Sequence, residues 1–134
     1  MDVTRMIATH PDVNGNVNAA LARALEEMAS CALTCTVCAD ACLAEDMVAD
    51  LRQCIRLNLD CADVCAAAAA LAGRRAGSNE AVLRLMLETC AEACRRCGEE
   101  CGRHAGHHEH CAVCSEACRR CEAACREAAA SITP

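Results

Sequence analysis

The sequence predicts an all-α protein: an antiparallel, up-down-up-down four-helix bundle with a core lined by cysteine. Its cysteines recur at spacings of 4, 3 and 4 residues, which places four side chains on one stripe of an α-helix. This stripe occurs four times in 134 residues, once with asparagine in place of its second cysteine. Good helix formers fill the gaps and no segment alternates with period two, so we expect no strands.

The stripes contain all but one of the sixteen cysteines and repeat as a pair. They are Cys31, Cys35, Cys38 and Cys42; Cys54, Asn58, Cys61 and Cys65; Cys90, Cys94, Cys97 and Cys101; and Cys114, Cys118, Cys121 and Cys125. Cys111 extends the last stripe backwards by three residues. The first and second stripes are offset by 23 residues and the third and fourth by 24, and Glu-Ala-Cys-Arg-Arg-Cys occurs at both 92–97 and 116–121. The pattern indicates a duplicated helical hairpin.

The first half of the chain is expected to form a short helix and two long ones. The short helix covers Thr4–Thr9 and is stopped by Pro11. The first long helix begins near Asn16 or Asn18, either of which could cap it, and runs to about Ala44. The second begins near Glu45 or Asp46, after a loop without Gly or Pro, and ends at Gly73.

The second half begins with a linker at 73–79 and is expected to form the other two long helices. Ser78 or Asn79 caps the third helix, which ends around 104–106, and the fourth runs from about His107 to Ser131. Short connections make successive helices antiparallel neighbours. We therefore expect an N-terminal arm at 1–15 and one Cys-rich bundle domain at 16–134.

Composition disfavours several classes of partner. The chain has no aromatic residue on which bases could stack, and its net charge of −6 does not suit a surface that follows phosphates. No apolar run approaches the roughly 18 residues that a membrane span requires. The opening segment lacks the pattern of a secretory signal, so we expect a cytoplasmic protein that binds neither nucleic acid nor membrane.

The thiols are expected to face inward, because outward stripes would form exposed patches prone to oxidation. As a plain core they would pack poorly, since so many small side chains leave a thin centre. As a disulfide framework they would need an oxidising compartment. Metal binding fits best: residues at i and i+3 or i+4 lie about 5–6 Å apart on a helix, within reach of one ion held by two thiolates. Each stripe spans about 16.5 Å, enough for a column of ions.

Among metals, Cu(I) fits the pattern best. All-thiolate ligation selects Cu(I), Zn²⁺ or iron–sulfur clusters. The CxxC pairs lie inside helical stripes rather than in zinc knuckles, and no cysteine precedes proline as it often does in iron–sulfur runs. About one Cu(I) per thiolate would leave a nearly neutral core, whereas four Zn²⁺ would leave buried negative charge.

The two ends of the bundle are expected to differ. One end gathers apolar residues: Leu21, Leu25, Met28, Leu71, Val82, Leu83, Met86, Leu87 and Ile132. The other gathers Asp46, Met47, Asp50, His104, His107, His108 and His110. Imidazole and thioether groups there suggest an entry port, in which we expect His104, His108 and Met47 to bind metal. His104 and Met47 are expected to continue the third and second stripes.

Two further features, Asn58 and the paired arginines, have plain structural interpretations. Asn58 either turns slightly off the axis of the bundle and bonds locally or simply removes one ligand. The Arg pairs at 95–96 and 119–120 fall between cysteines, so we expect them to be solvated or to form ion pairs with Glu on neighbouring helices or subunits.

The stripes at 31–42, 54–65, 90–101 and 111–125 resemble those of the bacterial copper storage proteins, over residues 17–131. The resemblance implies a four-helix bundle filled by Cys-bound Cu(I), assisted by His and Met at the open end. It also implies the family's cytosolic branch and a homotetramer. The resulting hypothesis is a cytosolic Cu(I) store that is not an enzyme, since no nucleophile–base pair is evident. A thiol–disulfide redox protein and a structural Zn or Fe–S protein remain alternatives.

Overall fold

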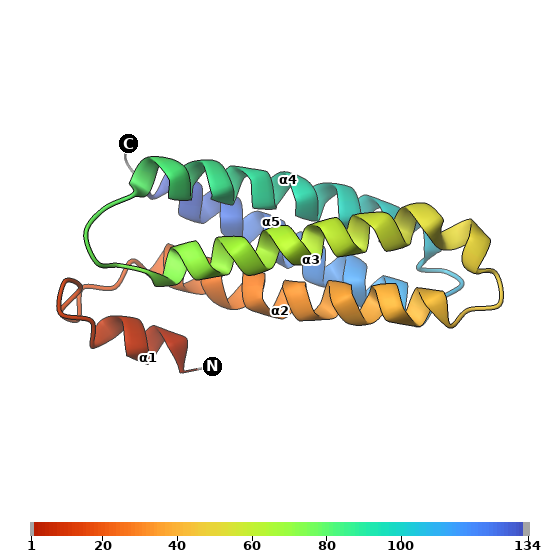
Figure 1. The fold of residues 1–134 in the computed structure, drawn as a ribbon, viewed down its shortest axis with the longest axis horizontal. Coiled ribbons are helices and arrows are strands. Elements are labelled where there is room, and N and C mark those ends of the chain that lie inside the picture. Colours follow the sequence, from red (N-terminus) through yellow and green to blue (C-terminus); the bar gives the residue numbers. More distant parts are fainter. Residues whose placement is uncertain (1, 133–134) are drawn as a thin grey trace.

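The computed structural model describes residues 2–132 and confirms the four-helix bundle (Figure 1). Its elements are α1 (Val3–Ala8), α2 (Ala19–Leu43), the 3₁₀ turn η1 (Val48–Leu51), α3 (Arg52–Gly73), α4 (Glu80–His104) and α5 (Glu109–Ala130). The four long helices alternate in direction, and α2 and α4 each pack against both α3 and α5. Short α1 lies beside the end of the bundle where α2 begins.

The start of α2 follows the prediction most closely. Asn18 is the N-cap, and its Oδ1 accepts a hydrogen bond of 3.1 Å from the backbone N–H of Leu21. In α4 the predicted cap Asn79 holds the N-cap position, but no side-chain hydrogen bond caps the helix. The short N-terminal helix ends one residue before the predicted Thr9.

The predicted starts of the two returning helices were too early. We expected the second helix to begin at Glu45 or Asp46, but α3 begins at Arg52, after η1. Leu51, the last residue of η1, is only 1% exposed, so this turn closes the bundle before the α-helix begins. Met47 precedes η1 and therefore does not lie on the stripe of α3, contrary to expectation. Similarly, α5 begins at Glu109, with His108 as its N-cap.

The end of the bundle near α1 is apolar, as predicted, and we call it the closed end. Its buried residues are Leu21, Leu25, Met28, Leu83, Leu87 and Ile132, joined by Ile7 from α1. Leu71 and Met86 are partly buried against them. Val82 was wrongly assigned to this core: it is 48% exposed, because it faces outward in the first turn of α4. The loop beside this end turns through Gly77 at φ +64°, where a side chain would be strained.

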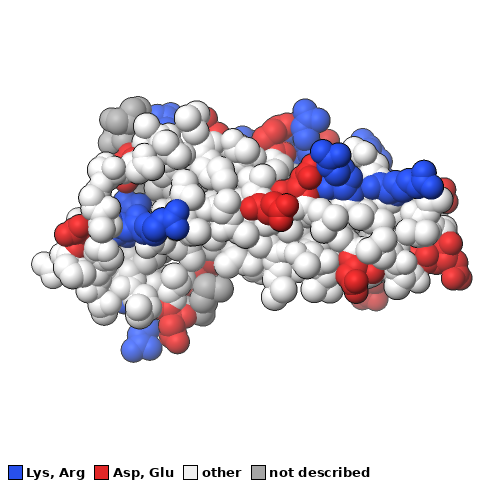
Figure 2. Space-filling model, viewed as in Figure 1, with Lys and Arg blue, Asp and Glu red and all other residues white. Residues whose placement is uncertain are grey.

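The surface carries mixed charges. Arg95 pairs with Glu92 and Glu99, and Arg96 also pairs with Glu92, all within α4 rather than with a neighbouring helix. These two guanidinium groups lower the pKa of Glu92 to about 2. The expected pairing between helices is found for Arg120 of α5, which lies 3.7 Å from Glu27 of α2. Figure 2 shows basic and acidic side chains lying next to each other, with broad uncharged areas between them. Within residues 2–132, no helix combines the length and apolar character needed to cross a bilayer.

Candidate metal centre

All sixteen cysteines point into the bundle and are at most 2% exposed, which confirms the inward orientation of the stripes. All are free thiols in the structure. The helical spacing stacks each stripe along one helix, and the antiparallel packing brings the four stripes face to face. The result is a continuous sulfur column along the bundle axis.

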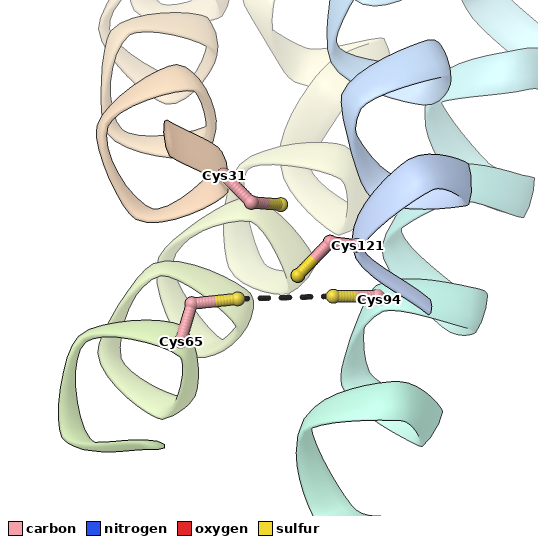
Figure 3. A group of neighbouring side chains, drawn as sticks. All are labelled: Cys31, Cys65, Cys94 and Cys121. Carbon is pink, nitrogen blue, oxygen red and sulfur yellow. Dashed lines mark hydrogen bonds between the residues drawn. The ribbon is translucent and has the colours of Figure 1, made fainter. Parts of the chain in front are cut away.

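The sulfur column is built from groups to which several helices contribute. Cys31, Cys65, Cys94 and Cys121 come from α2, α3, α4 and α5, and their Sγ atoms all lie within 4.8 Å of one another. Figure 3 shows the four side chains pointing toward a common centre, with Cys65 and Cys94 joined at 3.7 Å between their Sγ atoms. Such convergence of four thiols from four helices provides a ready set of soft ligands.

Neighbouring groups share members, so the column has no break between layers. Cys31 also belongs to a group with Cys35, Cys61 and Cys118. Cys35 and Cys118 in turn belong to the next group, with Cys97 and Cys114. Shared thiolates can bridge two ions, so an ion could move from layer to layer by exchanging one sulfur ligand at a time.

Asn58 points into the column, so the expectation that it turns off the axis was wrong. It is fully buried, and its Oδ1 accepts from the thiols of Cys97 at 3.0 Å, Cys114 at 3.3 Å and Cys101 at 3.4 Å. A buried amide needs such partners, and in this core only thiols are available to it. The sequence showed only the missing cysteine, whereas the structure shows a polar oxygen surrounded by three sulfurs.

The open end of the column holds a mixed group of Cys38, Cys42, Cys111 and His110. The Nδ1 atom of His110 lies 3.5 Å from Sγ of Cys38 and 3.6 Å from Sγ of Cys111. Cys38 and His110 also line a cleft of about 370 Å³ between α2 and α5, walled by Leu33, Val37 and Val113. From sequence, His110 is one of several polar-end residues that could bind metal, but His104, His108 and Met47 are preferred to it. The one feature of the sequence that could have identified His110 as a ligand is its position next to Cys111.

The three non-cysteine ligands expected from the sequence lie in different surroundings. His104 is held by Glu100, with its Nε2 atom 2.9 Å from Oε2. His108 is nearly buried, and its Nδ1 atom lies 2.9 Å from Oε2 of Glu45. Met47 is half exposed in the loop before η1. Glu45 could not be identified from sequence, because one acidic residue in a loop carries no distinguishing pattern.

Burial makes it costly to ionise the thiols at the open end. It raises the pKa of Cys42 to about 11 and also raises the pKa of Cys111. By contrast, hydrogen bonds from Cys101 and then Cys38 lower the pKa of Cys54. The core cannot hold many thiolates without compensating positive charge, which bound metal ions would supply.

Comparison with known proteins points to one family. The model of the copper storage protein family matches residues 17–130. A copper storage protein from Streptomyces lividans, solved with ten copper equivalents, is 53% identical, covers 97% of this chain and 99% of its own, and superposes with a TM-score of 0.92.

A second solved structure is that of a cytosolic copper storage protein from Streptomyces lividans during copper loading, with five coppers. It is 56% identical, covers 85% of this chain and 95% of its own, and has a TM-score of 0.83. No curated protein sequence matches the chain.

Proposed function

Because the chain belongs to the copper storage protein family, we propose that it is a cytosolic store that holds many Cu(I) ions on the thiolates of its bundle. The observation that carries this function is the unbroken sulfur column, in which groups of four thiols share members from layer to layer. A single structural ion needs only one such group. A column of shared groups suits a protein whose task is to hold many ions.

Charge and geometry both support Cu(I) as the stored ion. A linear S–Cu–S unit spans about 4.6 Å, twice a metal–sulfur bond of about 2.3 Å. The sulfurs of each group lie within 4.8 Å of one another, so small side-chain movements can accommodate this span. About one monovalent ion per thiolate leaves the core close to neutral, which limits the cost of burying charge. The role is storage rather than catalysis.

We place the entry of copper at the open end, where the ligands change from nitrogen to sulfur. His110 directs Nδ1 toward Cys38 and Cys111, so it can pass an incoming ion to thiolates. His104, His108 and Met47, expected as ligands from the sequence, remain part of this proposal as outer residues. The sixteen cysteines beyond them form the store, within the bundle domain at 16–134.

Zinc is the second candidate, because the shortest sulfur separations also fit it. Sγ atoms of neighbouring cysteines are 3.5–4.0 Å apart, and the ligands of a tetrahedral Zn–S site are about 3.8 Å apart. Four thiols per Zn²⁺ would fill the column with about four ions. The number of ions bound per chain therefore separates the two metals.

The test is an anaerobic titration of the reduced apo-protein with Cu(I), in competition with a chromophoric Cu(I) chelator. Storage predicts tight binding until about sixteen or more ions are bound per chain. Replacing one layer, Cys31, Cys65, Cys94 and Cys121, by alanine should lower the capacity by about four ions and leave the helices intact by circular dichroism. Saturation of the parent protein at one to four ions would overturn storage and favour zinc. Fewer than sixteen titratable thiols under denaturation without reductant would favour the redox alternative.

We also propose that the chain forms a homotetramer, as the resemblance implies. The exposed apolar side chains Leu33 and Val37 on α2 and Val113 on α5 support an interface on this face. Light scattering at micromolar concentration tests it: about four times the mass of the 14.1 kDa chain is expected. A monomer mass would contradict it.

A further inference from the structure

Glu45 lies at the open end, on the loop between α2 and η1, and faces two imidazoles at once. Its Oε2 atom is 2.9 Å from Nε2 of His110 and 2.9 Å from Nδ1 of His108. The His110 contact is a well-formed hydrogen bond. The two rings are stacked, with centroids 5.5 Å apart and planes 22° apart, so one carboxylate contacts a stacked pair.

The hydrogen bond to Glu45 determines which nitrogen of His110 is free. A carboxylate accepts but does not donate, so Nε2 of His110 must carry its proton toward Glu45. In the neutral ring, Nδ1 then has the lone pair, and Nδ1 is the atom that faces Cys38 and Cys111. His108 also faces Glu45 through Nδ1, at 2.9 Å, so its Nε2 atom is the nitrogen turned away from the carboxylate.

We propose that Glu45 is a positioning residue for copper entry: it holds His110 in the Nε2–H tautomer, with the Nδ1 lone pair aimed at the first thiols of the column. Carboxylates that fix the tautomer and ring orientation of a metal-binding histidine are a recurrent second partner in metal sites. This inference rests on the proposed function, because it assumes that copper passes His110.

The transfer step that Glu45 supports is ligand exchange without a change in oxidation state. Cu(I) delivered by a soluble carrier binds Nδ1 of His110. The thiol of Cys38 or Cys111 then loses its proton to solvent, a Cu–S bond forms, and the Cu–N bond breaks. His110 returns to its starting state with Nε2–H still bonded to Glu45, ready for the next ion.

An alternative is that Glu45 acts only as a negative charge that attracts cations. Asp46 separates the two explanations, because it is the next residue, has the same charge and is exposed. The matched variants Glu45→Gln and Asp46→Asn each remove one negative charge from the same loop. Only Glu45→Gln removes the carboxylate: both rings contact the same Oε2 atom, so an amide oxygen at that place would be a weaker, neutral acceptor, and an amide nitrogen there would direct its own N–H toward both rings.

The first measurement uses apo-protein and no copper. Long-range ¹H–¹⁵N correlation spectra report the tautomer of each histidine ring. We expect His110 in the Nε2–H form in the parent protein and in Asp46→Asn, and a mixture of tautomers in Glu45→Gln. An unchanged His110 tautomer in a folded Glu45→Gln protein would overturn the inference.

The second measurement is the initial rate of Cu(I) uptake by stopped-flow absorbance, followed by the final capacity. Glu45→Gln should slow uptake by about tenfold and leave capacity unchanged. Tenfold is the lower end of the loss usually seen when a residue that hydrogen-bonds to a metal-binding side chain is replaced. Glu45→Asp, which keeps a carboxylate, should recover part of the rate. Equal slowing by Asp46→Asn would show that charge alone acts and would refute positioning. Low capacity in the parent protein would instead refute storage, whatever the tautomers.

Discussion

The closed end and the sulfur column are both buried, but they are built from different side chains. The closed end uses branched and long aliphatic residues such as Leu21, Met28 and Leu87, each at most 4% exposed. The sulfur column uses cysteine and alanine, which fill the same space between helices with much smaller groups. Burying a leucine contributes about 1.5–3 kcal/mol, and small side chains contribute less. The bundle therefore has one region suited to stabilising the fold and another suited to holding ions.

The strongest test of this division is Leu87→Ala. Leu87 is fully buried at the closed end, so the substitution leaves a cavity, and we expect a loss of about 2–5 kcal/mol in the free energy of unfolding of the apo-protein. Urea denaturation followed by circular dichroism measures it. Copper capacity per folded chain should not change. The control is Leu85→Ala on the same helix, which is 64% exposed and should shift stability by no more than about 0.5 kcal/mol. Equal losses of stability in Leu87→Ala and Leu85→Ala would show that the closed end stabilises the bundle no more than an exposed position does.

Alkaline pH should destabilise the apo-protein through a buried thiol of the sulfur column. Burial raises the pKa of Cys42 from 9.0 to about 11, so the folded apo-protein keeps protons that the unfolded chain loses. This contribution to stability is complete below pH 9 and is lost as the pH rises toward 11. We expect the urea midpoint of the apo-protein to fall over that range. Copper-loaded protein should not show this fall, because its thiols are already deprotonated. A flat apo profile would contradict the buried neutral thiols.

Asn58→Cys sharpens the comparison within the column. It completes the second stripe and removes the amide that accepts from Cys97, Cys101 and Cys114. We expect a capacity higher by about one Cu(I) and an apo-protein less stable by about 1 kcal/mol, the usual net value of a lost hydrogen bond. Chelator competition and urea denaturation measure the two effects. An unchanged capacity would show that this layer is limited by space rather than by ligand number.

Surface ion pairs should matter least. Arg96→Ala removes a pair with Glu92 whose side chains are 64% and 45% exposed. The expected loss in the free energy of unfolding is the smallest of this series, close to the error of the measurement, and it should shrink further in 1 M salt. Thermal unfolding at low and high salt checks this. A loss as large as that of Leu87→Ala would mean that the surface of α4, rather than the closed end, stabilises the bundle.

The sequence predicted those parts of the molecule that depend on helical periodicity. The inward stripes, the cap at Asn18 and most of the closed end followed from spacing and side-chain type. The starts of α3 and α5 did not, because η1 and the cap at His108 depend on how the chain closes the bundle, with Leu51 buried there. The contacts of Asn58 and Glu45 also escaped prediction, since each joins helices or loops far apart in sequence.

The duplicated hairpin has a consequence for the history of this chain. The quartet Cys31, Cys65, Cys94 and Cys121 takes two members from the hairpin α2–α3 and two from α4–α5. One hairpin alone supplies only part of such a group, and it would leave its sulfur face open to solvent. An ancestral polypeptide of half this length would therefore have had to pair with an identical copy to enclose its thiols, with a twofold axis along the column.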